Sequence, residues 1–156
     1  MEQRQRQKQS QSQSPASGMG YLIVRASTAG GAIPLEGATV KIWRDFPVSE
    51  ESTEQKIHNG DVHRVLLTDR DGNTPRISLI TPPREISYTP GGIPYAYYHI
   101  DVTADGFYPQ EFIRVPIYDG ITSIQNAYLI PIAEGNVING QEPLTDRVDE
   151  SVNPLL

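Results

Sequence analysis

Histidines and carboxylates are the side chains of this sequence that could bind a metal ion or transfer a proton. The chain has no cysteine, so thiolate zinc sites, cysteine nucleophiles and disulfides are excluded. Its histidines are His58, His63 and His99, and their spacing matches none of the common zinc motifs. A histidine in or near a strand is more simply explained as a structural residue. We therefore predict no metal site.

Residues 69–73 begin like a calcium-binding loop, with Asp69 and Asp71 two positions apart. Such a loop needs Gly at its sixth position and Glu at its twelfth, where this chain has Thr74 and Ile80. Gly72 can instead adopt the positive φ that a tight hairpin turn requires. A hairpin turn is therefore the better interpretation of this segment.

Enzyme motifs are absent from the sequence as well. It contains no G-x-S-x-G, P-loop or G-x-G-x-x-G segment, which leaves nucleophile-elbow hydrolases and nucleotide-binding enzymes without support. Two carboxylates can meet in space as in glycosidases. However, Asp101 on the polar face of a strand and Asp105 in a turn are explained without catalysis. We predict that the protein is not an enzyme and has neither catalytic residues nor a cofactor.

Aromatic side chains are concentrated between residues 88 and 108. Alternation along a strand places Tyr95, Tyr97 and His99 on one face, and Tyr108 follows shortly afterwards. Tyrosine combines a flat apolar ring with a polar hydroxyl, so these residues are candidates for a surface that stacks on sugars or contacts a protein. Strand propensity and cross-strand packing explain the same residues without a ligand. The two interpretations remain open at this stage.

The elements that must position these residues are strands, because apolar residues recur with a period of two. We expect strands at residues 21–26, 39–43, 65–68, 77–79, 97–104, 112–118 and 125–130. Seven short strands separated by turns predict an all-β fold, a single seven-stranded β-sandwich. We expect its core to contain Leu22, Val24, Val40, Ile42, Leu67, Ile77, Leu79, Ile100, Val102, Val115 and Leu129.

The two ends differ in composition from the centre. Residues 1–18 are rich in Gln and Ser and contain no large apolar side chain after Met1, so we expect a disordered tail. Residues 134–156 are acidic and rich in turn-forming residues, and we expect a second flexible tail. Residues 19–133 then form the single domain. Residues 44–61 are expected to be a charged excursion, with a hairpin at Asn59 and Gly60.

Charge and hydropathy exclude several partners. A net charge of −6 argues against nucleic acid, because neutralising phosphates requires a basic face. No run of about 18 apolar residues is present, so we expect no membrane-spanning helix. The first residues lack the apolar segment of a secretory signal, and we therefore expect synthesis in the cytoplasm.

Two segments of the chain resemble the carboxypeptidase regulatory-like domain, a transthyretin-like β-sandwich. Residues 33–40 match its P-L-x-G-A-x-V strand entry, and residues 67–74 match its T-D-x-x-G turn. Residues 94–107 and 125–131 are similar to the non-catalytic N-terminal region of clostridial spore cortex-lytic enzymes. The resemblance covers about residues 20–132 and implies a transthyretin-like topology. The peptidoglycan-cleaving domain of those enzymes has no matching positions here, so no lytic residue is carried over.

The resemblance implies an accessory, non-enzymatic module of a spore-forming bacterium. We expect a structural or interaction module of the spore envelope or cortex-lytic machinery. Its partners would be proteins or further copies of itself, joined by pairing at an open sheet edge. The alternative is a module that binds peptidoglycan or another carbohydrate through the tyrosine-rich surface.

Overall fold

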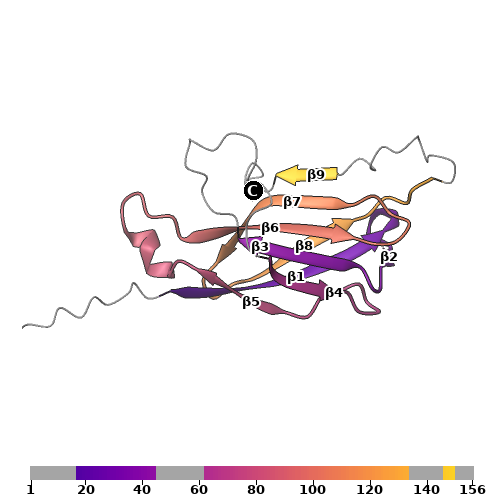
Figure 1. The fold of residues 1–156 in the computed structure, drawn as a ribbon. Coiled ribbons are helices and arrows are strands. Elements are labelled where there is room, and N and C mark those ends of the chain that lie inside the picture. Colours follow the sequence, from indigo (N-terminus) through magenta and orange to yellow (C-terminus); the bar gives the residue numbers. More distant parts are fainter. Residues whose placement is uncertain (1–16, 45–61, 134–145, 150–156) are drawn as a thin grey trace, which may run out of the picture.

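The computed structural model describes residues 17–44, 62–133 and 146–149, which form two packed β-sheets (Figure 1). The strands are β1 (Gly18–Thr28), β2 (Ile33–Pro34), β3 (Thr39–Arg44), β4 (Val62–Leu67), β5 (Ile77–Thr81), β6 (Tyr95–Thr103), β7 (Gln110–Tyr118), β8 (Thr122–Tyr128) and β9 (Asp146–Asp149). Within these segments the helical turns are η1 (Ala29–Gly31) and η2 (Arg84–Tyr88). The predicted all-β sandwich is confirmed, and each of the seven expected strands is present.

One sheet, the β1 sheet, is organised around its longest strand. β5 runs antiparallel to the first half of β1, β8 runs parallel along most of β1, and β2 pairs antiparallel with its end. The other sheet, the β6 sheet, has the strand order β4-β3-β6-β7-β9. β6 lies between two antiparallel partners, β3 and β7, and these two registers determine which way each of its side chains points.

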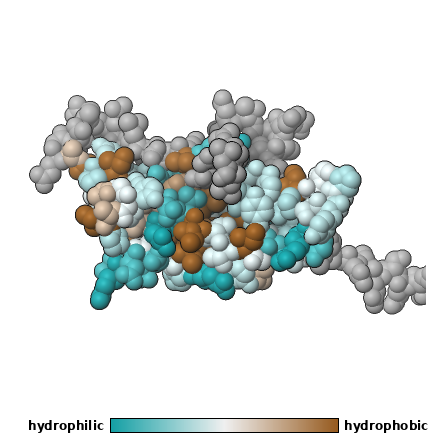
Figure 2. Space-filling view, turned by 180° about the vertical axis from the view of Figure 1, so that it is seen from behind, coloured by the Kyte–Doolittle hydropathy of each residue, from teal (hydrophilic) through white to brown (hydrophobic). Residues whose placement is uncertain are grey.

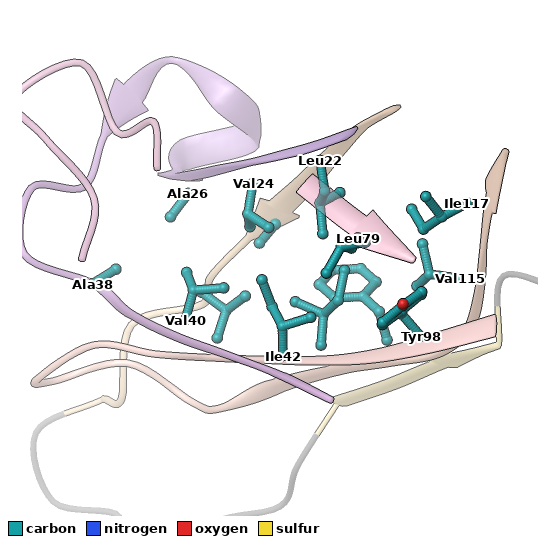
Figure 3. Packing of buried hydrophobic residues seen from close by; sticks show 14 of the residues in the cluster. Leu22, Val24, Ala26, Ala38, Val40, Ile42, Leu79, Tyr98, Val115 and Ile117 are labelled. Carbon is teal, nitrogen blue, oxygen red and sulfur yellow. The ribbon is translucent and has the colours of Figure 1, made fainter. Parts of the chain in front are cut away.

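The core lies between the two sheets, where alternate side chains of facing strands meet (Figure 3). Leu22 from β1 and Ile42 from β3 are fully buried there, as is Ile100 from β6. Tyr98 also points inward, and its hydroxyl donates a hydrogen bond of 2.7 Å to the carbonyl oxygen of Ile80 in β5. Burial raises the pKa of the Tyr98 phenol, which keeps it a neutral donor. The two sheets are therefore linked through the core by a hydrogen bond as well as by apolar contact.

The predicted core is confirmed except at one position. Leu67 is 61% exposed, so its assignment to the core is wrong. The register explains the error: Leu66 of β4 pairs with the buried Val40 of β3 and therefore faces inward, whereas Leu67 points to the other side. Ile77 is partly buried and packs against the core. The buried predicted residues are Leu22, Val24, Val40, Ile42, Leu79, Ile100, Val102, Val115 and Leu129.

The predicted turn at residues 69–73 is present, but it is not a hairpin. The Asp69 carboxylate accepts hydrogen bonds from the backbone N–H groups of Asp71 (2.9 Å) and Asn73 (3.0 Å). Gly72 has a φ of 77°, as the turn requires. The strands on either side, β4 and β5, belong to different sheets. The turn therefore carries the chain from one layer of the sandwich to the other.

The C-terminal segment also differs from its prediction. Residues 134–156 were expected to be flexible, yet Asp146–Asp149 form β9, which pairs in parallel with β7. Val148 of β9 packs against the edge of the core. This apolar contact offsets part of the conformational entropy that is lost when the segment becomes ordered. Of the tail expected at residues 1–18, residues 1–16 lie outside the described residues, whereas Gly18 already begins β1. The expected hairpin at Asn59 and Gly60 also lies outside the described residues.

Replacing Val102 with Ala should lower the free energy of unfolding by about 1–3 kcal/mol, because two methyl groups are removed from a fully buried position in β6. Chemical denaturation of both proteins measures this difference. Leu67→Ala is the matched control, because its side chain is 61% exposed and its removal should change stability by less than about 0.5 kcal/mol. Equal losses for the two variants would contradict the registers of β4 and β6.

Candidate functional site

The outer face of the β6 sheet carries the residues that the sequence singled out. Ala96, Tyr98, Ile100 and Val102 point into the core, so the intervening residues of β6 must point outward. The predicted common face of Tyr95, Tyr97 and His99 follows from this alternation. Asp101 continues the same row toward the end of the strand.

Tyr95, Tyr97 and Tyr118 form a compact group at the start of β6, which we call the tyrosine cluster. The ring centroids of Tyr95 and Tyr97 are 5.0 Å apart, and those of Tyr95 and Tyr118 are 5.4 Å apart in an edge-on arrangement. Tyr118 joins the group because the β6–β7 register places it directly opposite Tyr95. All three side chains are half-buried, so the cluster combines ordered rings with accessible surface.

The hydroxyl groups of the cluster interact as well as the rings. Tyr97 donates a hydrogen bond of 3.3 Å to the Tyr95 hydroxyl. This hydrogen bond is the main reason that the pKa of Tyr97 is raised, because it stabilises the neutral phenol. Arg114 lies close enough to oppose the increase through its positive charge. The raised pKa favours the neutral form of the Tyr97 phenol, whose hydroxyl can both donate and accept hydrogen bonds.

His99 cannot serve as the exposed contact residue that the sequence suggested. Its ring stacks on the indole of Trp43 at a centroid distance of 4.5 Å, with 13° between the planes. Trp43 and His99 are cross-strand partners in the β3–β6 register. His99 is only 3% exposed and Trp43 only 7%, so neither ring is available to stack on a ligand. Trp43 was not identified from the sequence, because its partner depends on this register.

Tyr108 is also separate from the tyrosine cluster. It follows the far end of β6, where its backbone N–H donates a hydrogen bond of 2.9 Å to the carbonyl oxygen of Ile130. Tyr95 begins β6 and the strand has nine residues, so the length of the strand alone separates the two positions by roughly 26 Å. The four predicted contact residues therefore do not form one surface. Of the four, Tyr95 and Tyr97 lie together, and Tyr118 is the further member of their cluster.

A second group on the same face brings together His99, Asp101 and Glu111. Nε2 of His99 lies 3.2 Å from Oδ1 of Asp101. Asp101 and Glu111 are cross-strand partners in β6 and β7. One potential ligand atom from each of the three residues lies within 4.8 Å of the other two. The sequence analysis, which predicted no metal site, did not anticipate this grouping.

The β6–β7 connection explains why the group was missed. A two-residue hairpin at Asp105 and Gly106 would place Gln110, not Glu111, opposite Asp101. Instead, Phe107 bridges to Pro131 near the end of the β1 sheet, and the connection is longer. The register consequently shifts by one residue. The His-x-Asp spacing at residues 99–101 was the available signal, because residues two apart on a strand share a face.

Exposed apolar side chains occur elsewhere on the molecule, including Val65 on β4, Ile80 on β5 and Ile124 on β8. Figure 2 shows the apolar residues of one face as separate patches surrounded by polar residues. Scattered exposed apolar residues are ordinary on protein surfaces, so we assign no site to them.

None of the helical segments in the described part of the chain has the length and apolar character needed to cross a membrane.

Comparison with known proteins finds structural matches but no family. No family model matches the chain, and neither does any curated protein. Among solved structures, catechol 1,2-dioxygenase from Acinetobacter sp. ADP1 is 17% identical with a TM-score of 0.47 and covers 86% of this chain. The minor pilin GBS52 of Streptococcus agalactiae is 18% identical with a TM-score of 0.42 and covers 79% of this chain. The Bacillus anthracis TIE protein is 12% identical, with a TM-score of 0.41 and coverage of 74%.

This chain spans only part of each of those proteins: 60% of the dioxygenase, 49% of the pilin and 17% of the TIE protein. At such identities and TM-scores, the matches assign neither a family nor an activity to this chain.

Replacing Tyr95 with Phe should lower the pKa of Tyr97, because the substitution removes the hydroxyl that accepts its hydrogen bond. Nuclear magnetic resonance of ring-labelled tyrosine during an alkaline titration resolves the individual residues. Tyr108→Phe is the control and should leave the Tyr97 titration unchanged, since Tyr108 lies beyond the other end of β6. An unchanged Tyr97 curve in the Tyr95 variant would contradict the hydrogen bond.

Proposed function

We propose that this protein is a non-catalytic β-sandwich module that associates with protein partners or with further copies of itself. We place it in the spore envelope or the cortex-lytic machinery of a spore-forming bacterium. The resemblance of residues 94–107 and 125–131 to the non-catalytic region of cortex-lytic enzymes supports this setting. The pairing of β9 with β7 supports association, and it is the observation on which this proposal depends.

β9 completes an edge of the β6 sheet with a strand from the C-terminal segment. The pairing runs from Gln110 and Asp146 to Ile113 and Asp149. At its end, Nε of Arg114 donates a hydrogen bond of 3.1 Å to Oδ1 of Asp149. The pairing involves only four residues of each strand, so a β9 strand from a second copy could make the same contacts. Exchange of such a strand between copies is a known route to assemblies.

Cysteine cross-linking tests this exchange cleanly, because the natural chain contains no cysteine. Ile113 and Asp149 are paired residues in β7 and β9, and adjacent strands place their Cα atoms within disulfide range. If strands exchange, an oxidised mixture of Ile113→Cys and Asp149→Cys proteins should contain a disulfide-linked dimer of the two. Light scattering should also show fewer copies per particle after deletion of residues 134–156.

An Asp105→Cys protein mixed with the Asp149→Cys protein is the control. Asp105 is exposed in the β6–β7 connection and is not paired with β9, so it should not form the specific dimer. Two results together would refute exchange. One is a disulfide that forms only within single chains of an Ile113→Cys, Asp149→Cys double variant. The other is a number of copies per particle that is unchanged after deletion of residues 134–156, which include β9.

The tyrosine cluster favours a second candidate function, binding of peptidoglycan or another carbohydrate. Sugars stack on flat aromatic rings and form hydrogen bonds with nearby hydroxyl groups, and the cluster provides both. The packing of Tyr95 against Tyr97 and Tyr118 holds the rings in place before a ligand arrives. Such preorganisation lowers the entropic cost of binding.

The double substitution of Tyr95 and Tyr97 by Ala should abolish co-sedimentation with peptidoglycan sacculi, because it removes the stacking rings from the cluster. Thermal unfolding should show that the domain remains folded, since the side chains that pack the core are on the opposite face of β6. Tyr88→Ala is the control, because Tyr88 lies in η2 and is 82% exposed. Unchanged co-sedimentation of the double variant would eliminate the cluster as the binding surface.

A further inference from the structure

We propose that His99, Asp101 and Glu111 form a binding site for a divalent transition metal ion such as Zn²⁺. One imidazole nitrogen and two carboxylates are typical zinc ligands in proteins. The site would lie on the outer face of the β6 sheet, next to the Trp43–His99 stack.

The spacing of the ligand atoms is compatible with one small ion. Tetrahedral zinc with bonds of about 2.0–2.1 Å holds its ligand atoms roughly 3.3–3.4 Å apart. Nε2 of His99 and Oδ1 of Asp101 are 3.2 Å apart. The carboxylate of Glu111 completes a group in which no pair of ligand atoms exceeds 4.8 Å. The Glu111 carboxylate therefore has to move by only about 1.5 Å to reach the ligand spacing of a tetrahedral ion.

The backbone positions these ligands before any ion binds. His99 and Asp101 are alternate residues of β6, and Glu111 faces Asp101 across the register with β7. The stacked indole of Trp43 holds the imidazole of His99, whose side chain is only 4% exposed. The Asp101 side chain is 24% exposed, which leaves the group accessible to an ion from solvent.

The charges of the group favour a cation. Like charges directly opposite each other on adjacent strands are unfavourable, and Asp101 and Glu111 are such a pair. Lys41 on β3 is the register partner of Asp101, so its ammonium group would compete with a metal ion for that carboxylate. The imidazole nitrogen gives a transition metal an advantage over this ammonium group, and over Mg²⁺ and Ca²⁺, which prefer oxygen ligands.

Titration of the full-length, EDTA-treated protein with ZnCl₂ tests the proposal in two ways. Calorimetry should show a saturable site that Mg²⁺ and Ca²⁺ do not occupy. The emission of Trp43 should change over the same zinc range, because Trp43 is the only tryptophan of the chain and stacks on the proposed ligand. Zinc should also raise the melting temperature, since it binds the folded protein.

Substitutions that preserve side-chain size identify the ligands. Asp101→Asn and Glu111→Gln should each weaken zinc binding by at least about tenfold, and each should shift the tryptophan response to correspondingly higher zinc concentrations. Asp105→Asn is the matched control in the adjacent connection and should leave the affinity unchanged. A double substitution of His58 and His63 by Gln, outside the proposed group, should also leave it unchanged.

Two outcomes would overturn the proposal. The first is zinc affinity that remains within about twofold of the natural protein's value in both carboxylate variants. The second is loss of zinc binding in the His58 and His63 double variant with no change in the carboxylate variants. Comparison of far-ultraviolet circular dichroism spectra and melting temperatures keeps these outcomes separate from misfolding, and neither outcome bears on strand exchange.

Discussion

The strict alternation of side chains along β6 is the constraint on which the rest of this structure depends. β6 is held between β3 and β7, so every second side chain must enter the core. Tyr98 and Ile100 fill the interior, while Tyr97, His99 and Asp101 are forced outward. A slip of one residue would bury the Asp101 carboxylate and expose the core, which is energetically prohibitive. The outer face of β6 is therefore as well defined as the core itself.

The outer face of the β6 sheet is divided into two chemically different parts. At one end, Tyr95 and its neighbours offer accessible rings and hydroxyl groups. Farther along the strand, the buried His99 is directed at Asp101 and cannot contact a large ligand. One strand thus carries both the surface proposed to bind carbohydrate and the group proposed to bind a metal ion. The second part begins at the stack of His99 on Trp43.

The edges of the sheets present a different problem, because an open edge exposes backbone groups that can pair with another chain. β9, which has only four residues from Asp146 to Asp149, pairs with part of the edge strand β7 and provides partners for its backbone groups there. β9 therefore covers part of the edge of its own chain, and in the proposed exchange it would cover the same edge of a second copy. The unpaired N–H and C=O groups along the edge of β7 are the reason for the pairing within one chain and for the proposed pairing between chains.

The sequence by itself determined the fold class, the positions of seven strands and most of the core, because these depend on a period of two that is visible locally. It also placed Tyr95, Tyr97 and His99 on one face for the same reason. Only the tertiary structure decided which residues of other strands join them. The bridge from Phe107 to Pro131 accompanies a longer β6–β7 connection, and the resulting register brings Glu111 to Asp101. Burial of His99 beneath Trp43, exposure of Leu67 and the pairing of β9 likewise depend on strand registers, which are long-range contacts that local pattern does not encode.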